Sequence, residues 1–167
     1  MTTLLNWKKG FFKSTYQIFA GNVPIGYLRE NTWSQTAEGE INGKRYSFKI
    51  SGFFNPKTTI LDSNGIDIIG TITYSSWMTK ATITLKDTLI QWKYDNAWNT
   101  KWSMTSSDGT IINYKGSSSK GSIEYLKGDE GNELHLLTGL YITNYYWQIT
   151  FAVLVACFVP IMAATAN

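Results

Sequence analysis

The end of the chain carries no charge over a long stretch. From Leu134 to Asn167 the sequence reads LHLLTGLYITNYYWQITFAVLVACFVPIMAATAN and contains no Lys, Arg, Asp or Glu. Each Å² of apolar surface left in water costs about 25 cal/mol, so such a segment must be covered by protein, by lipid, or by each in part. Where this segment lies therefore decides the fold.

The preceding region has the periodicity of β-strands. Apolar and polar residues alternate in runs such as Tyr46–Ile50 and Ala81–Leu85, which gives each run one apolar face. Pairs such as Asn42-Gly43 separate the runs and favour two-residue hairpin turns. The region from Phe11 to Tyr125 is therefore predicted to be an antiparallel meander of short strands.

An internal repeat underlies these strands. The segments that begin at Phe11, Phe53 and Ala97 share an order of aromatic residue, turn, strand, turn and strand, and a second hairpin follows each of them. Propellers have repeats of similar length, but three blades are fewer than the usual four to eight. The sequence predicts a mainly β protein: an antiparallel barrel of about twelve strands in three four-strand units.

A barrel of this size needs something inside it. Eight strands leave an interior that side chains just fill, so about twelve leave room for an α-helix, which is about 10 to 12 Å wide. The first part of the uncharged tail is apolar on all sides, which is typical of a buried helix. We expect residues 133–147 to form a central helix whose barrel-filling side chains are Leu134, Leu137, Leu140 and Tyr141.

This pattern resembles the tubby C-terminal-like fold, which tubby proteins, phospholipid scramblases and plant LURP-one-related proteins share. The resemblance rests on FFNPKTTILDSNGIDIIGTI, from Phe53, and NELHLLTGLYITNYYWQ, from Asn132, and covers about Tyr16 to Trp147. Small bacterial proteins of this type are the most similar. The resemblance implies a twelve-stranded barrel around a central helix and, in some members, binding to phosphoinositides or membranes. No functional residue of the family carries over to this chain.

The apolar tail is too long for the barrel alone. As one straight helix it would measure roughly 50 Å, whereas a six-residue strand spans about 20 Å. We expect residues 1–147 to form the barrel with its helix and residues 148–167 to form an apolar extension. Ile149–Ala164 is slightly short for a membrane span and includes Pro160. It either packs on the barrel or on a partner, or it associates with a membrane through Tyr145, Tyr146, Trp147, Phe151 and Phe158.

The sequence contains no catalytic, metal-binding or nucleotide-binding motif. His135 is the single histidine, and a position in the core or at the rim suits it better than catalysis. Glu38 and Glu40 share one strand face, but the alternating face is apolar, so we expect both in solvent rather than in a glycosidase pair. We predict a non-enzymatic protein without a cofactor or a metal.

Charge and cysteine content restrict the partners and the compartment. The net charge is +3 at pH 7, and the basic residues show no clustering of the kind that nucleic-acid binding requires. Cys157 is the single cysteine, and the N-terminal sequence lacks the pattern of a signal peptide. We expect a cytoplasmic protein that binds no nucleic acid.

Two functions are compatible with these expectations. The first is a lipid- or membrane-associated binding or scaffold module, with a phospholipid membrane or a protein as its partner. The alternative is a soluble domain that binds carbohydrate or another small ligand through exposed aromatic residues, because such rings stack against sugars. The candidates for stacking are Trp7, Trp33, Trp77, Trp92, Trp98 and Trp102. Their recurrence in the repeat favours packing in the barrel instead.

Overall fold

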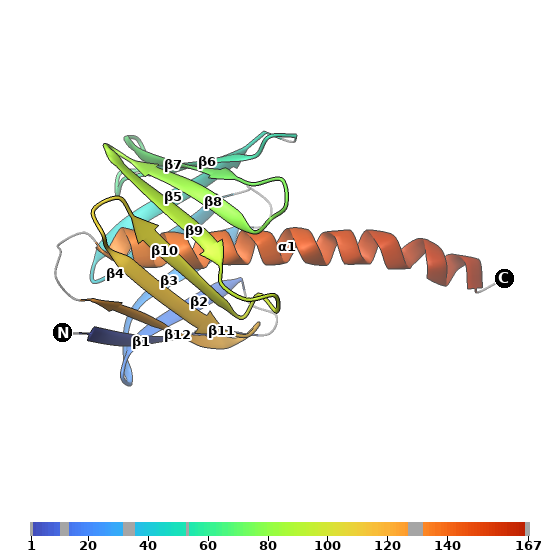
Figure 1. Ribbon diagram of the computed structural model, residues 1–167, viewed down its shortest axis with the longest axis horizontal. Coiled ribbons are helices and arrows are strands. Elements are labelled where there is room, and N and C mark those ends of the chain that lie inside the picture. The colour runs from blue at the N-terminus through green and yellow to red at the C-terminus, as the bar shows by residue number, and fades with distance from the viewer. Residues whose placement is uncertain (1, 11–13, 32–35, 53, 127–131, 166–167) are drawn as a thin grey trace.

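The structure is a computed structural model, and it describes residues 2–10, 14–31, 36–52, 54–126 and 132–165, with only the backbone for residues 126, 132 and 159–165. Twelve strands are followed by one helix (Figure 1). The strands are β1 Thr2–Lys9, β2 Thr15–Ala20, β3 Val23–Asn31, β4 Thr36–Ile41, β5 Lys44–Ser51, β6 Lys57–Leu61, β7 Ile68–Tyr74, β8 Lys80–Leu85, β9 Thr88–Tyr94, β10 Lys101–Ser106, β11 Ile111–Gly116 and β12 Lys120–Leu126. The helix is α1, Asn132–Thr165.

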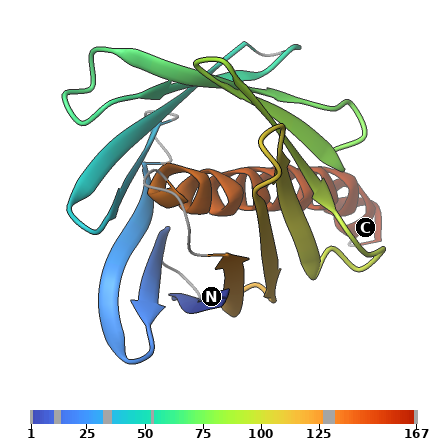
Figure 2. The same cartoon turned by 60° about the vertical axis from the view of Figure 1, so that its left-hand side comes forward.

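The strands form one closed antiparallel barrel. Each strand pairs with the next one along the chain, and β1 closes the barrel by pairing with β12, from Thr2 opposite Leu126 to Lys8 opposite Lys120. A closed barrel presents no unpaired edge to other chains. Figure 2 shows the barrel wall around the helix. The predicted fold class, a mainly β barrel of twelve antiparallel strands that encloses the C-terminal helix, is confirmed.

Tight turns connect the strands, and the sequence provides residues that tolerate them. Asn42 and Gly43 join β4 to β5 with φ angles of 51° and 79°. Two-residue hairpin turns of type I′ need positive φ at both central positions, and Asn-Gly adopts this conformation at low cost. The Asn42-Gly43 turn predicted from the sequence is therefore present.

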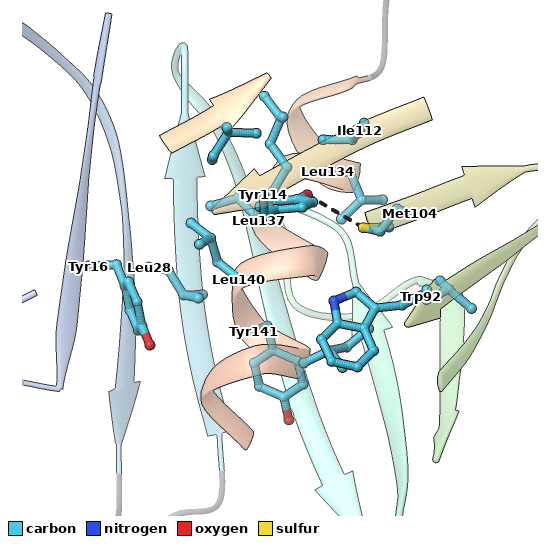
Figure 3. Close-up of a cluster of buried hydrophobic side chains, with 14 of the residues drawn as sticks. Tyr16, Leu28, Trp92, Met104, Ile112, Tyr114, Leu134, Leu137, Leu140 and Tyr141 are labelled. Carbon is cyan, nitrogen blue, oxygen red and sulfur yellow. Dashed lines mark hydrogen bonds between the residues drawn. The ribbon is translucent and has the colours of Figure 1, made fainter. Parts of the chain in front are cut away.

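One hydrophobic core fills the barrel, and the first part of α1 lies in its centre. Leu137, Leu140 and Ile142 are fully buried, and the ring of Tyr141 stacks on Phe48 with centroids 4.5 Å apart. Figure 3 shows how helix residues face the inner side of the wall; the labelled residues are Tyr16, Leu28, Trp92, Met104, Ile112, Tyr114, Leu134, Leu137, Leu140 and Tyr141. The four residues predicted to fill the barrel all belong to this core.

Gly139 allows α1 to lie against the barrel wall. A Cβ atom at this position would lie 2.2 Å from the hydroxyl oxygen of Tyr114 and 2.8 Å from the sulfur of Met104. The Tyr114 hydroxyl donates a 3.1 Å hydrogen bond to the carbonyl oxygen of His135. The helix and β11 thus lie so close together that position 139 has room only for glycine.

The helix continues beyond the barrel without a break (Figure 1). Its side chains are buried or half-buried from Leu134 to Trp147 and exposed from Thr150 to Phe158. At 1.5 Å per residue, the segment from Gln148 to Phe158 extends roughly 15 Å past the wall. One helix thus both fills the barrel and projects from it.

Candidate functional site

The helix leaves the barrel at one defined end. The connections at this end follow β1, β3, β5, β7, β9 and β11, because the strands alternate in direction. Two contacts of α1 mark the exit: Gln148 donates a hydrogen bond to the carboxylate of Glu30, and the Tyr146 hydroxyl donates one to the carbonyl oxygen of Lys80. We call this end, with its connections and the adjoining strand ends, the exit rim.

A polar network holds α1 inside the exit rim. The side-chain oxygen of buried Asn144 accepts a 2.9 Å hydrogen bond from the Tyr16 hydroxyl and a second bond from the ammonium group of Lys9. Burial raises the pKa of Glu30, an effect that Asn144, Lys9 and Gln148 oppose. Burial also lowers the pKa of Lys9, and the charge of Glu30 opposes that shift. The network links β1, β2 and β3 to one turn of the helix.

A cavity of about 420 Å³ lies beside this network. Tyr141, Tyr145 and Ile149 form its apolar wall, and Glu30 and Gln148 form part of its polar wall. Glu30 is the one carboxylate among the described lining residues. General acid–base chemistry needs a second group that receives or returns the proton, or a nucleophile, at a defined position. Among the described lining residues, the titratable groups beside Glu30 are the hydroxyls of Tyr141 and Tyr145, whose pKa burial raises, and the cavity offers a place for a ligand.

A second cavity, of about 300 Å³, lies between the barrel and the projecting helix. Its walls come from the connection after β9, from the connection after β7 and from α1, and the lining includes Tyr94, Trp98, Trp147, Phe151 and Leu154. Trp98 is 85% exposed. This apolar hollow is open at the surface of the exit rim, so water, lipid or a ligand can enter it.

Exposed aromatic side chains gather at the exit rim. Phe54, Trp77 and Trp98 are 92%, 86% and 85% exposed and follow β5, β7 and β9. At the opposite end, the large exposed apolar residues of the described chain are aliphatic and include Val23 and Ile66. The two ends of the barrel thus differ in surface chemistry, and the aromatic end is the one from which α1 projects.

The five residues proposed as membrane contacts differ in how exposed their side chains are. Phe151 and Phe158 are 69% and 58% exposed on the projecting part of α1. Tyr145 and Trp147 are half-buried at the rim. Tyr146 is 1% exposed and packs against Trp92 in the core, with ring centroids 5.4 Å apart. The side chain of Tyr146 is therefore part of the barrel filling and not of its surface.

The candidate tryptophans for stacking also divide into buried and exposed side chains. Trp7, Trp92 and Trp102 are at most 2% exposed and belong to the core, whereas Trp77 and Trp98 are exposed. Trp33 lies outside the described residues. Sequence alternation did not distinguish the two groups because both follow the same repeat. Trp77 and Trp98 lie in connections between strands, and this position could have predicted from the sequence that they are exposed.

The other candidate residues lie away from the exit rim or in ion pairs. Burial lowers the pKa of His135 at the start of α1, and Asp108 opposes the shift. Glu38 pairs with Arg29 at 3.2 Å, and Glu40 pairs with Arg45 at 2.6 Å. Within the described part of the chain, no group of three or more His, Cys, Asp or Glu side chains is arranged to hold a metal ion.

Comparison of the chain with protein-family models, with curated proteins and with solved structures finds no match. Among the described residues, no helix combines the length and the apolar composition that crossing a membrane requires. The interpretation of the exit rim therefore depends on its own features, which are the exposed apolar helix, the exposed aromatic rings and the two hollows.

Proposed function

We propose that this protein is a non-enzymatic module that associates with a phospholipid membrane through its exit rim. The observation that carries the proposal is the apolar surface of the projecting helix. Its exposed side chains are Phe151 69%, Val153 51%, Leu154 49%, Val155 44% and Phe158 58%. A contiguous exposed apolar patch marks a surface that is covered in use, by lipid or by protein. The projecting part of the helix carries no charge on any side. Lipid hydrocarbon can surround such a helix completely, whereas a protein partner usually covers one face.

The dimensions of the helix suit insertion into one leaflet. From Gln148 to Phe158 it extends roughly 15 Å, about half of the 30 Å hydrocarbon core of a bilayer. Aromatic side chains with a polar edge favour the interface between hydrocarbon and water. With the helix inserted, Trp77 and Trp98 at the rim lie at that interface, and the barrel stays in water.

The resemblance to the tubby C-terminal-like fold is a further part of this proposal. A twelve-stranded barrel around a central apolar helix is the architecture that the resemblance implies, and some proteins of that superfamily bind membranes. We infer that the chain is a small member of the superfamily that acts at the cytoplasmic face of a membrane. The insertion proposal itself rests on the exposed helix.

Co-sedimentation of the full chain with neutral phosphatidylcholine vesicles tests insertion. Wild type is expected to sediment with the vesicles, and the double variant Leu154→Glu, Phe158→Glu is expected to remain in solution, because a charge in hydrocarbon costs about 3 kcal/mol. The matched control is Val23→Glu, Ile66→Glu, which places the same charges on exposed apolar residues at the opposite end. Equal sedimentation of both variants would contradict insertion. Failure of wild type to sediment, with dimers in sedimentation velocity, would instead place a second copy on the helix.

The second candidate function is carbohydrate binding in solution. Trp98 is exposed beside the 300 Å³ hollow, and Trp77 is exposed in a neighbouring connection of the same rim, as sugar stacking requires. A glycan array with wild type and Trp98→Ala tests it. Binding to a polysaccharide that Trp98→Ala abolishes, together with no affinity for vesicles, would replace the membrane proposal.

A further inference from the structure

One lysine lies on the outer face of each of six adjacent strands at the exit rim. Their neighbours in sequence, such as Ala81, Trp92 and Trp102, point into the core, so the lysines point outward and are exposed. The strands are β8, β9, β10, β11, β12 and β1, which are consecutive in the barrel. The residues are Lys80, Lys93, Lys101, Lys115, Lys120 and Lys8, and we call them the lysine arc.

The lysines of the arc oppose one another in pairs. Three pairs lie directly opposite in the strand register: Lys80 with Lys93, Lys101 with Lys115, and Lys8 with Lys120. Residues directly opposite in an antiparallel pair have Cβ atoms about 5 Å apart, and like charges there destabilise the sheet. Repulsion between two opposed lysines thus occurs three times along the arc. A bound anion would reduce this repulsion.

Among the described residues, few acidic side chains lie near the arc. Glu124, on the outer face of β12, is diagonal to Lys115 in the strand register. On this half of the barrel, Glu38 pairs with Arg29, and Glu30 lies in the polar network. Asp95 lies 3.7 Å from Lys93, and it is the one carboxylate within 4 Å of an arc lysine among the described residues. The opposite end carries the acids Glu40, Asp62, Asp67, Asp87, Asp108 and Glu133. Charge is therefore polarised along the barrel axis, with the basic end at the exit of α1.

One end of the arc lines a basic hollow. A cavity of about 520 Å³ lies between β1, β2 and β12, and its charged lining residues are Lys8, Lys9 and Lys120. Thr15, Gln17 and Ser119 add hydrogen-bonding groups. Ammonium and hydroxyl donors are the groups that bind phosphate oxygens in proteins. The hollow has the size and the donors for a phosphate-bearing headgroup.

We propose that the lysine arc binds the headgroups of anionic phospholipids, so that the protein selects negatively charged membranes. This inference rests on the proposed function, because insertion of α1 brings the exit rim, and with it the arc, to the headgroup layer. Each lysine near an anionic bilayer surface strengthens binding about fivefold at physiological salt. The arc covers one side of the rim, so the barrel leans toward the membrane on the side of β8 to β12 and β1.

The test compares vesicles of phosphatidylcholine with vesicles that also contain phosphatidylserine. Wild type is expected to bind the anionic vesicles more tightly, and this preference is expected to disappear at about 1 M salt, where the Debye length is only about 3 Å. The triple variant Lys80→Gln, Lys101→Gln, Lys120→Gln removes one lysine from each opposed pair. It is expected to bind anionic vesicles about 100-fold more weakly and neutral vesicles like wild type.

The fold of the triple variant is checked by thermal unfolding. Its melting temperature is expected to equal or exceed that of wild type, because repulsion between opposed lysines is removed. The matched control, Lys44→Gln, Arg45→Gln, Lys86→Asn, removes the same charge from the opposite end. Asn tolerates the φ of 50° at position 86, and this control is expected to bind both vesicle types like wild type.

The outcomes distinguish failure of the arc proposal alone from failure of both proposals. Equal binding of wild type to neutral and anionic vesicles, or equal loss of affinity in the triple variant and the control, would overturn the arc proposal and leave insertion standing. No binding to either vesicle type would overturn both. Binding to single-stranded RNA that depends on the arc, without binding to vesicles, would also overturn both and identify a nucleic acid as the polyanion.

Discussion

The hydroxyl of Tyr16 donates a 2.9 Å hydrogen bond to the side-chain oxygen of Asn144, across 128 residues of sequence. Lys9 donates to the same oxygen. This one acceptor therefore connects β1, β2 and α1 where the helix leaves the barrel. A hydrogen bond weakens once its donor and acceptor are more than about 3.2 Å apart, so this contact opposes sliding of the helix along its axis. Together with the close packing at Gly139, Asn144 thus restricts how deeply the helix sits and how much of it projects.

Replacement of Asn144 is expected to destabilise the fold. Asn144→Leu leaves the Tyr16 hydroxyl and the Lys9 ammonium without their acceptor in a buried position, at a cost of about 2 kcal/mol or more. Tyr16→Phe removes only one donor and is expected to cost about 1 kcal/mol. Urea unfolding measures both. An Asn144→Leu protein as stable as wild type would contradict the role of this network.

Gly139→Ala tests the close packing of helix and wall. Alanine has a higher helix propensity than glycine by about 1 kcal/mol, so an isolated helix would gain stability. In the barrel the new methyl group meets Tyr114 and Met104, and a net loss of about 1 to 3 kcal/mol in the free energy of unfolding is expected.

The control for Gly139→Ala is Thr150→Ala, on the exposed part of the same helix. It is expected to change the free energy of unfolding by less than about 0.5 kcal/mol, as surface substitutions usually do. A Gly139→Ala protein more stable than wild type would mean that α1 does not lie against Tyr114.

His135 is expected to make stability depend on pH below neutrality. Burial lowers its pKa from 6.5 in the folded state, so the unfolded chain binds the proton more readily. Its contribution is therefore fully present above the unfolded pKa and decreases as the pH falls below it. Glu30, whose pKa is raised, acts with the opposite sign. Urea unfolding between about pH 7.5 and 5 should show a smaller decrease for His135→Gln than for wild type. Identical pH profiles would exclude this contribution of His135.

A chain that ends at Gln148 is expected to fold like the full chain but to lose binding to neutral phosphatidylcholine vesicles. The side chains from Thr150 to Phe158 are exposed, so their removal takes little apolar surface from the core. Circular dichroism and thermal unfolding report the fold, and vesicle sedimentation reports binding. Loss of the fold would show that the projecting segment belongs to the core, and retained sedimentation would assign binding to the rim alone.

The sequence was sufficient to predict the architecture because its patterns are local. Alternation in Ala81–Leu85 puts Ala81 and Ile83 on the buried face, and the charge-free tail from Leu134 needs an apolar surround that a wide barrel supplies. The resemblance to tubby-like proteins stays a prediction. Which side chains of the helix are buried was harder to predict from the sequence. Tyr146 is buried and Trp147 is half-buried because of where the barrel wall lies, which the sequence pattern does not reveal.

The features of the exit rim were not predicted because they depend on register and closure. Lys8 lies opposite Lys120 only because β1 pairs with β12, which are at opposite ends of the barrel sequence. Lys80 and Lys93 meet only at one register of their hairpin. The polarisation of charge along the barrel axis likewise appears only when alternate connections are assigned to the same end.

Insertion of the projecting helix into lipid is tested most directly at Cys157. This residue is the single cysteine and is exposed, so an environment-sensitive fluorophore attached to its thiol reports one position near the end of the apolar segment. With anionic vesicles, we predict a blue-shifted, brighter emission that a water-soluble quencher no longer reaches. The same fluorophore at Val23→Cys in a Cys157→Ser background should stay quenchable. Emission from position 157 that stays unshifted and fully quenchable on vesicle-bound protein would contradict insertion.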